Sequence, residues 1–430
     1  MTIPTPPQMG DPNTPEEIPK RLRLPGVFRI VLAGESLSLF GTQIASMMIP
    51  IIAVLTLHSG EFMIGVLSAA GWLPIIIFGL LAGTIVDRTS RWVIMVICNV
   101  VRGILITIIP ILAFINQLTI PALIIIAFFV GICNVFFDIA YQTYVPDLVS
   151  TDLLGLANSR LELIRSIAQL AGPLLGGVLA TAYKPEYLIS INSVTFLIAL
   201  VALLFLPGRY RILPQPPTEK DSPNPKIFED VLSGLRLVWQ SRQIRLVVTS
   251  GAFLNIFVAG ASALFVLFVT RTLGYNPTIL GISVALLGVG AFCGAATYPY
   301  WSKKFHEGQC VALGLTSMAL GTILLALSAW TSIPLATLLA AQVLIGYGTP
   351  IINIALVTLR QKLTPPGALG KVNASARVAI MSSLPLGALI ISFIGEKLGI
   401  PAALWVAAIG EVAVLCTLGS ALLRMRPKTL

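Results

Sequence analysis

Long apolar segments separated by short polar breaks dominate this chain. Each is long enough to cross a bilayer as a helix, which takes roughly 20 residues. The apolar positions do not alternate with period two, so a β-barrel is not expected. The pattern predicts an all-α membrane protein of twelve transmembrane helices in two six-helix halves. The predicted spans cover residues 27–57, 62–86, 92–114, 118–145, 154–182, 186–207, 243–273, 277–301, 309–331, 333–360, 367–398 and 400–423.

Composition agrees with this interpretation. Hydrophobic residues make up 56% of the chain and charged residues 11%, whereas a soluble domain carries about 25% charged residues. The predicted organisation is a cytosolic tail (1–26), a first half (27–207), a cytoplasmic linker (208–242), a second half (243–423) and a short cytosolic tail (424–430).

The linker combines a proline-rich polar stretch with an amphipathic segment. Val231, Leu235, Val238 and Trp239 recur at helical spacing, with Arg236 among them. This spacing predicts a helix that lies on the lipid headgroups. A solvated helix leaning on the bundle is the alternative.

Cationic residues indicate the orientation. Of the 28 Lys and Arg residues, only Lys184, Arg271 and Lys397 fall in loops on the side opposite the linker. The positive-inside rule therefore predicts cytoplasmic termini in a plasma (inner) membrane protein. The net charge of +10 then reflects topology and contact with the lipid bilayer, and it does not indicate a nucleic-acid partner.

Other function classes find no support in the motifs. The chain lacks G-x-x-x-x-G-K-[ST], H-E-x-x-H and G-x-S-x-G, so an ATP-driven pump or an intramembrane hydrolase is not expected. Its five cysteines show no metal-ligand spacing. We therefore expect no enzyme, no metal and no cofactor.

An internal repeat supports the two halves. Sliding the chain by half of its 430 residues lays Asp138-Ile139-Ala140 on Asn353-Ile354-Ala355, and paired Gly, Asn and Thr residues follow at the same offset. Two related halves around a midplane site are the architecture of many secondary transporters.

Three motifs carry a family resemblance. The stretch Gly83-Thr84-Ile85-Val86-Asp87-Arg88-Thr89-Ser90-Arg91 is similar to the loop signature between helices 2 and 3 of the major facilitator superfamily. Gly172-Pro173-Leu174-Leu175-Gly176-Gly177 is similar to an element typical of exporters that work by antiport. The segment from Phe136 to Ser159 resembles the branch of macrolide and enterobactin exporters.

The charged loop predicts a gate. When the cytoplasmic ends close, Asp87 can sit against a helix N-terminus of the opposite half while Arg91 reaches Asp147, which forms a latch. The second half has Pro299 and Lys303 at the equivalent positions, so the latch is expected in one half only. The alternative is that these charges merely end the helices at the headgroups.

The helix-5 motif is expected to act through packing. Gly172, Gly176 and Gly177 let a neighbouring backbone approach closely, and Pro173 removes a helical N–H and bends the helix. A plain helix crossing with no bearing on export is the alternative.

Ionisable residues inside the spans are costly and mark a function by default. Five of them fall at similar depth in the first half, namely Glu35, Arg102, Asp138, Glu162 and Arg165. The acids outnumber the bases, so one carboxylate is free to exchange protons. In the family that the chain resembles, helices 1 and 4 line the central cavity, which makes Glu35 and Asp138 the leading proton-coupling candidates, with Glu162 as a further one. Arg102 is similar to an arginine common in helix 3 of the exporter branch, and the resemblance implies that it holds the carboxylates ionised until substrate arrives. A static salt-bridge cluster is the alternative.

Arg377 is the main charge in the corresponding layer of the second half. It is expected either to meet an anionic substrate group or Asp138 across a cavity, or to extend towards the cytoplasm. Uncharged candidates serve either as cavity lining or as contacts between helices. They are Gln43, Asn134, Gln142, Asn255, Gln342 and Asn353.

The sequence thus predicts a proton-coupled antiporter that exports a moderately hydrophobic small molecule. Uptake of a metabolite by symport, lipid flipping and sensing on the same fold are the alternatives. Expected partners are the small-molecule substrate, protons and the bilayer. A monomer is the working expectation for an oligomeric state that the sequence leaves open.

Overall fold

The computed structural model describes residues 24–150, 153–208, 235–364 and 369–423. Within these ranges, twelve helices are long and apolar enough to cross a membrane, which confirms the predicted fold class. Nearly all of the predicted terminal tails and most of the linker, including Val231, lie outside the described residues.

Each apolar run forms one helix or a helix with a short extension. In the first half these are α1 (Gly26–Ile51) with the π-helix η1 (Ile52–Thr56), α2 (Glu61–Arg88), α3 (Arg91–Phe114), α4 (Ile120–Leu148), α5 (Leu154–Ala182), and α6 (Pro185–Leu188) with α7 (Ser190–Leu204). In the second half they are α9 (Arg242–Leu267) with the π-helix η5 (Phe268–Thr272), α10 (Pro277–Lys304), α11 (Glu307–Leu327), α12 (Pro334–Leu363), α13 (Leu369–Leu398), and α14 (Ile400–Val414) with the π-helix η6 (Leu415–Gly419) and α15 (Ser420–Leu423).

The halves repeat each other in helix length. Helices α1 and α9 have 26 residues each, and α2 and α10 have 28 each. Proline at the first or second position begins α4, α10, α12 and α14, where its missing N–H costs no helical hydrogen bond. The repeat inferred from the sequence therefore extends to where the helices begin and end.

The π-helical ends η1 and η5 of the two halves have the same backbone hydrogen-bond pattern. Leu57 N donates to Ile52 O over 3.0 Å, and Leu273 N donates to Phe268 O over 2.9 Å. A left-handed residue follows each end, His58 with φ of 48° and Gly274 with φ of 70°. In these wide turns, some backbone carbonyl groups near the end of each helix have no helical partner and can accept a hydrogen bond from another segment.

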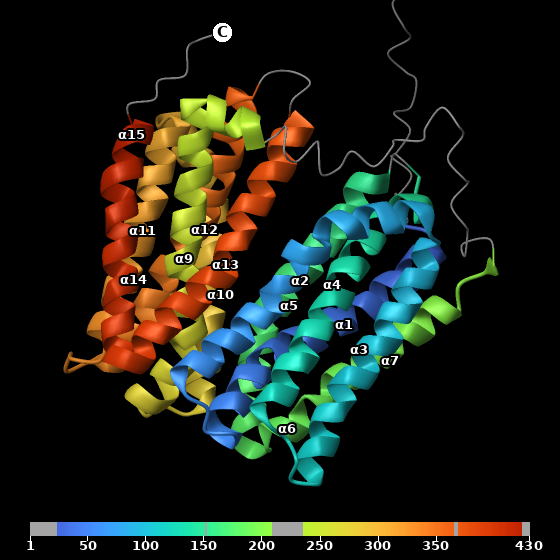
Figure 1. The fold of residues 1–430 in the computed structure, drawn as a ribbon. Coiled ribbons are helices and arrows are strands. Elements are labelled where there is room, and N and C mark those ends of the chain that lie inside the picture. Colours follow the sequence, from blue (N-terminus) through green and yellow to red (C-terminus); the bar gives the residue numbers. More distant parts are fainter. Residues whose placement is uncertain (1–23, 151–152, 209–234, 365–368, 424–430) are drawn as a thin grey trace, which may run out of the picture.

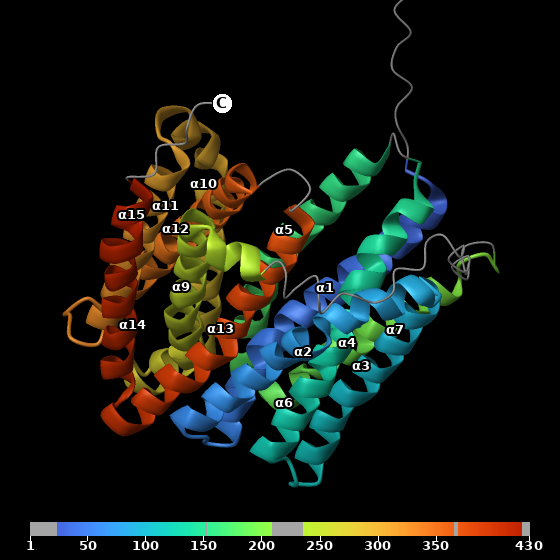
Figure 2. The same cartoon turned by 45° about the horizontal axis from the view of Figure 1, so that its top comes forward.

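The two halves lie side by side and contact each other chiefly through two helix pairs, α2 with α13 and α5 with α10. In Figure 1 the blue-to-green and the yellow-to-red helices diverge towards the top, where α2, α4, α10 and α12 finish, and meet at the bottom. Figure 2 shows the same divergence after rotation. We call the upper side the open end and the lower side the closed end.

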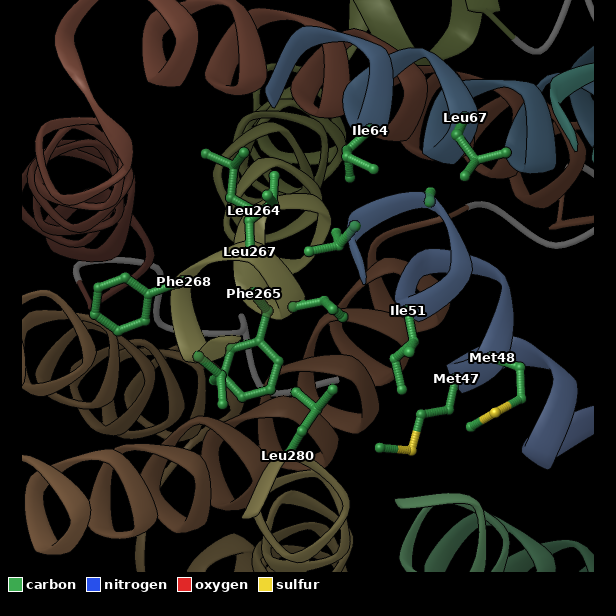
Figure 3. Close-up of a cluster of buried hydrophobic side chains, with 14 of the residues drawn as sticks. Met47, Met48, Ile51, Ile64, Leu67, Leu264, Phe265, Leu267, Phe268 and Leu280 are labelled. Carbon is green, nitrogen blue, oxygen red and sulfur yellow. The ribbon is translucent and has the colours of Figure 1, made fainter. Parts of the chain in front are cut away.

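An apolar seal joins the halves at the closed end. Figure 3 shows Met47, Met48 and Ile51 of the first half facing Leu264, Phe265 and Leu280 of the second. Ile51, Leu264, Leu267 and Phe268 are fully buried. Burying such side chains contributes roughly 1.5–3 kcal/mol each relative to leaving them in water, so the seal excludes water from the closed end.

Among the described residues, two hydrogen bonds cross between the halves at the closed end. Arg271 Nη2 of η5 donates to Val54 O of η1 over 3.0 Å, using a carbonyl that the π-helical end leaves available. Phe62 N, at the start of α2, donates to Glu396 Oε2 of α13 over 3.2 Å. The seal thus has polar contacts at its rim.

The described end of the linker packs on the second half. Residues 235–240 are helical, and Val238 is buried against Ile244, Val248 and Val372. Trp239 is 61% exposed on the other face. The segment is amphipathic as predicted, and its apolar contact is with the bundle.

Replacing Arg271 with Ala should loosen the closed end. A hydrogen bond to a charged donor contributes about 1.5 kcal/mol, so the population separated at that end should rise roughly tenfold. Distances between spin labels at Gln117 and Ser332, in loops of the two halves at the closed end, report the separation.

Arg245→Ala is the matched control, because Arg245 lies in the same helix run and donates within its own half, to Trp239 O. Equal widening in both variants, or none in Arg271→Ala, would contradict the role of the Arg271 contact.

Candidate functional site

A cavity of about 970 Å³ lies between the halves. Its walls come from α1, α2, α3, α4 and α7 of the first half and from α9 and α13 of the second. Ile64, Leu67 and Val266 belong both to its lining and to the seal, so the seal forms its floor. Ligand pockets of drug-sized molecules have roughly 300–1,000 Å³, so the volume suits such a molecule.

The cavity lining is mostly apolar and carries two charged residues in the described part of the chain, one from each half. Asp138 of α4 and Arg377 of α13 both line it and are exposed to it. The two interact electrostatically, but no ion pair within 4 Å joins them among the described salt bridges. Arg377 therefore lies in the cavity wall, and its role towards substrate or Asp138 stays a prediction.

Arg102 is buried behind this wall, with 4% of its surface exposed. It donates to Asn134 Oδ1 over 3.1 Å and to Asn99 Oδ1 over 2.5 Å. Its guanidinium also lies 4.0 Å from the ring centroid of Phe137 and 4.4 Å from that of Phe196. Amides and aromatic rings, rather than carboxylates, hold this cation in place.

Glu35 of α1 is half-buried and lies within electrostatic range of Arg102, Asp138 and Arg165. Three residues of the predicted charged layer thus act on Glu35, which has no hydrogen-bonded partner among the described residues. Burial of a carboxylate favours its protonated form and nearby cations favour its ionised form, so a carboxylate under both influences is suited to bind and release a proton.

Glu162 and Arg165 form a separate pair on α5. Arg165 Nη1 lies 3.7 Å from Glu162 Oε2, and both side chains are at least half exposed. An exposed pair one helical turn apart contributes little to stability. Glu162 does not line the described cavity, so its candidacy for proton coupling stays a prediction.

The uncharged candidates lie in different parts of the structure. Gln142 and Asn134 line the cavity. Asn255 Nδ2 donates to Ile380 O over 3.1 Å, joining α9 to α13, and Gln43 packs against Gly172. Asn353 is exposed outside the cavity lining. Asn255 and Gln43 thus contact neighbouring helices, which is one of the two roles expected of this group.

Several residues of the cavity lining were not predicted from the sequence. They are small hydroxyl or amide residues and one aromatic residue of the wall, namely Thr42, Ser46, Ser68, Trp72, Asn192 and Ser262. Serine and threonine are common in apolar helices, where they bond to the preceding turn. Their type alone therefore gives no signal, and only the helix arrangement identifies them.

The charged loop lies at the open end. Asp87 and Arg88 are exposed, and Asp87 forms no ion pair within the described ranges. A Cβ built on Gly83 would meet nothing within 4 Å. No neighbouring helix therefore approaches Gly83 closely in this conformation, in which the halves diverge at that end.

Arg91 and Asp147 do meet, but within the first half. Arg91 Nη1 lies 2.6 Å from Asp147 Oδ2 and also donates to Thr143 O over 3.2 Å. This contact joins α3 to α4 while the open end is apart. It is therefore a staple inside one half, whereas the sequence predicted it as part of a latch between halves.

The second half contains the same staple with reversed charges. Glu307, at the start of α11, pairs with Lys362, near the end of α12. Arg91 begins α3 and Asp147 lies near the end of α4 in the same way. Each half therefore joins its third and fourth spans at the open end by an ion pair.

The helix-5 glycines face two neighbours. A Cβ on Gly172 would overlap Gln43 Cβ of α1. A Cβ on Gly177 would lie 2.5 Å from Pro277 O and 2.9 Å from Gly281 Cα of α10. Pro173 lies inside α5 and is buried. The motif thus allows a close backbone contact of α5 with α10, across the two halves.

A bundle of two related six-helix halves, with a cavity between them and a seal at one end, defines the architecture of a secondary transporter. The chain belongs to the Major Facilitator Superfamily, whose family model matches residues 31–379 and 248–430. It is therefore an integral membrane transporter of small molecules, and not an enzyme.

Curated relatives of the chain include efflux proteins. It is 24% identical over 360 residues to the multidrug efflux pump Tap of Mycolicibacterium fortuitum, covering 80% of this chain and 84% of Tap. It is 20% identical to macrolide efflux protein A of Streptococcus pyogenes, covering 87% of this chain and 90% of that protein. The resemblance to the macrolide exporter branch is thereby confirmed.

Solved structures share the fold. A mutant of the nucleoside transporter NupG superimposes with a TM-score of 0.79 at 11% identity, covering 93% of this chain and 100% of NupG. At this identity the likeness concerns the fold alone.

The staple can be tested by exchanging its charges. Arg91→Ala and Asp147→Ala should each lower the melting temperature of the purified protein by about 2 °C, because a partly exposed pair contributes up to about 1 kcal/mol. The double variant Arg91→Glu with Asp147→Lys should recover the loss, since the second half uses that order of charges.

Arg88→Ala, at an exposed cation of the same loop, should leave the melting temperature unchanged. A double variant no more stable than the single ones would show that the pairing is not what stabilises this contact.

Proposed function

We propose that this transporter exports a moderately hydrophobic small molecule by alternating access, driven by inward proton flow. The observation that carries the proposal is the cavity, which is sealed on one side, mostly apolar, and flanked by the carboxylates Asp138 and Glu35. The efflux relatives support export.

The open end is the cytoplasmic end in this proposal. Arg88, Lys303, Lys304 and Lys362 lie at the finishing ends of α2, α10 and α12, in accord with the positive-inside rule. Both termini are then cytoplasmic, and the conformation described is the inward-facing one, ready to take substrate from the cytoplasm.

Closure of the open end forms the second conformation. Asp87 is the exposed anion of the first half that can meet a helix N-terminus of the second half. The staples at Arg91 and Glu307 keep each half intact while the halves move. The seal and the Arg271 contact separate in the same step, because both span the halves at the other end.

Proton coupling is assigned to Asp138 or Glu35. Asp138 lies in the cavity wall, where water reaches it through the open end. Glu35 lies beside it, within range of the same cations, Arg102 and Arg165. A proton on either carboxylate changes the charge of the cluster by one unit, which alters how strongly its cations attract the remaining carboxylate and thereby biases one conformation.

Reconstitution tests the proposal directly. Proteoliposomes with an imposed pH gradient would be supplied with a panel of macrolides, siderophores and dyes. Accumulation of a compound on the side from which protons leave, against its own gradient, is the expected result. Accumulation with the proton flow would indicate uptake by symport, and movement of labelled lipid alone would indicate a flippase; each would overturn the proposal.

Asp138→Asn and Glu35→Gln separate coupling from binding. At least one of them should reduce accumulation driven by the pH gradient by about tenfold, corresponding to about 1.4 kcal/mol, while exchange of substrate across the membrane without a gradient continues. Each is compared with Glu61→Gln, at the closed-end start of α2 and outside the cavity wall. Full pH-dependent accumulation in both cavity variants would contradict the assignment.

A further inference from the structure

Arg377 is the cation of the cavity wall that lacks a fixed partner. It lines the cavity from α13 and is exposed to it. Within the described ranges no hydrogen bond or ion pair engages its guanidinium, and its charge acts on Asp138 across the cavity. A guanidinium that faces a cavity without a fixed partner is available to bind an anionic group that enters the cavity.

The other cations near the cavity have side-chain contacts of their own and lie outside its lining. Arg102 is held by Asn99, Asn134 and two aromatic rings. Arg165 pairs with Glu162. Neither is part of the cavity lining, so a ligand in the cavity meets Arg377 as the accessible cation of the described wall.

The two carboxylates near the cavity, Asp138 and Glu35, interact electrostatically with different sets of these cations. Arg102, Arg165 and Arg377 all act on Asp138. Glu35 is within range of Arg102 and Arg165, and Arg377 is not among the charges acting on it. Three cations thus act on Asp138, and none of the described salt bridges fixes that carboxylate to Arg377.

We propose that Arg377 binds the anionic group of the substrate, and that the substrate is an amphiphilic organic carboxylate. The planar guanidinium donates two parallel hydrogen bonds to a carboxylate. The apolar body then lies against side chains that share the wall with Arg377 from both halves, namely Trp72, Ile75, Ile76, Val135, Met381 and Leu384.

A cationic ligand fits this site less well. It would have to compete with three arginines for Asp138 and would approach Arg377 with like charge. A neutral ligand would leave Arg377 without a counter-charge. The charge distribution therefore discriminates among amphiphiles of equal shape by their head group.

This inference rests on the proposed role of the cavity as the substrate site, and it is independent of transport direction and of proton coupling. Binding to the purified full-length protein therefore tests it separately. The probes are a dansyl-labelled alkyl carboxylate and the carboxamide and alkylammonium of the same chain length. Energy transfer from Trp72, in the cavity wall, reports occupancy, and Trp72→Phe identifies its share of the signal.

The carboxylate should bind the wild-type protein about tenfold more tightly than the other two probes. Arg377→Gln should abolish this preference and leave the affinity for the carboxamide unchanged, which also shows that the variant is folded. Arg377→Lys should keep part of the preference, because a point charge remains without the planar fork. Arg160→Gln, at an exposed arginine of α5 outside the cavity lining, is the matched control.

A wild-type preference for the alkylammonium or the carboxamide would overturn the inference. So would a preference for the carboxylate that survives Arg377→Gln, or energy transfer that does not depend on Trp72. If the carboxylate binds through Arg377 but is never pumped, the proposed export fails while the binding site stands. If only cationic or neutral compounds are pumped, the reverse holds.

Discussion

The apolar seal between η1 and η5 is the interaction on which the conformation depends. It forms the floor of the cavity, closes one end of the molecule and lets the other end diverge. In a bilayer the hydrophobic effect does not draw helices together, so close packing and water exclusion at the interface must do so. Side chains such as Phe268 and Ile51 provide that packing near the membrane surface, where water would otherwise enter.

Movement between the halves requires that each half stays intact, and the staples provide this at the diverging end. Arg91 with Asp147 and Glu307 with Lys362 occupy equivalent places on equivalent helices. Reversing both charges preserves the attraction between the two side chains, and it exchanges which of the two helices carries the cation and which the anion. The two halves can therefore be equally stable while presenting different charges to each other at the open end.

Apolar run length predicted the twelve spans, because the cost of exposing backbone polar groups to lipid leaves helices as the only solution for such runs. The pairing of charges was harder to foresee. Asn99, Asn134 and two aromatic rings contact Arg102, and only the arrangement of the helices identifies these partners. The ion pair of Glu307 with Lys362 could not be predicted by matching identical residues between the halves, because its charges are reversed relative to Arg91 and Asp147. Thr42 and Ser262 could be placed in the cavity wall only from the arrangement of the helices.

The polar contacts between the halves at the closed end use side chains of the second half, and the contact proposed for the open end would use a side chain of the first half. Arg271 reaches from η5 to a carbonyl of η1, and its equivalent position in the first half is Leu55. Asp87 belongs to the first half, and Lys303 stands at its equivalent in the second. A contact that uses one side chain and one backbone group or helix end is weaker than a salt bridge between two buried charges and breaks without leaving a second charge unpaired. Such contacts keep the two conformations close in free energy, which is what a transporter must do if its substrate and its coupling ion are to decide between them.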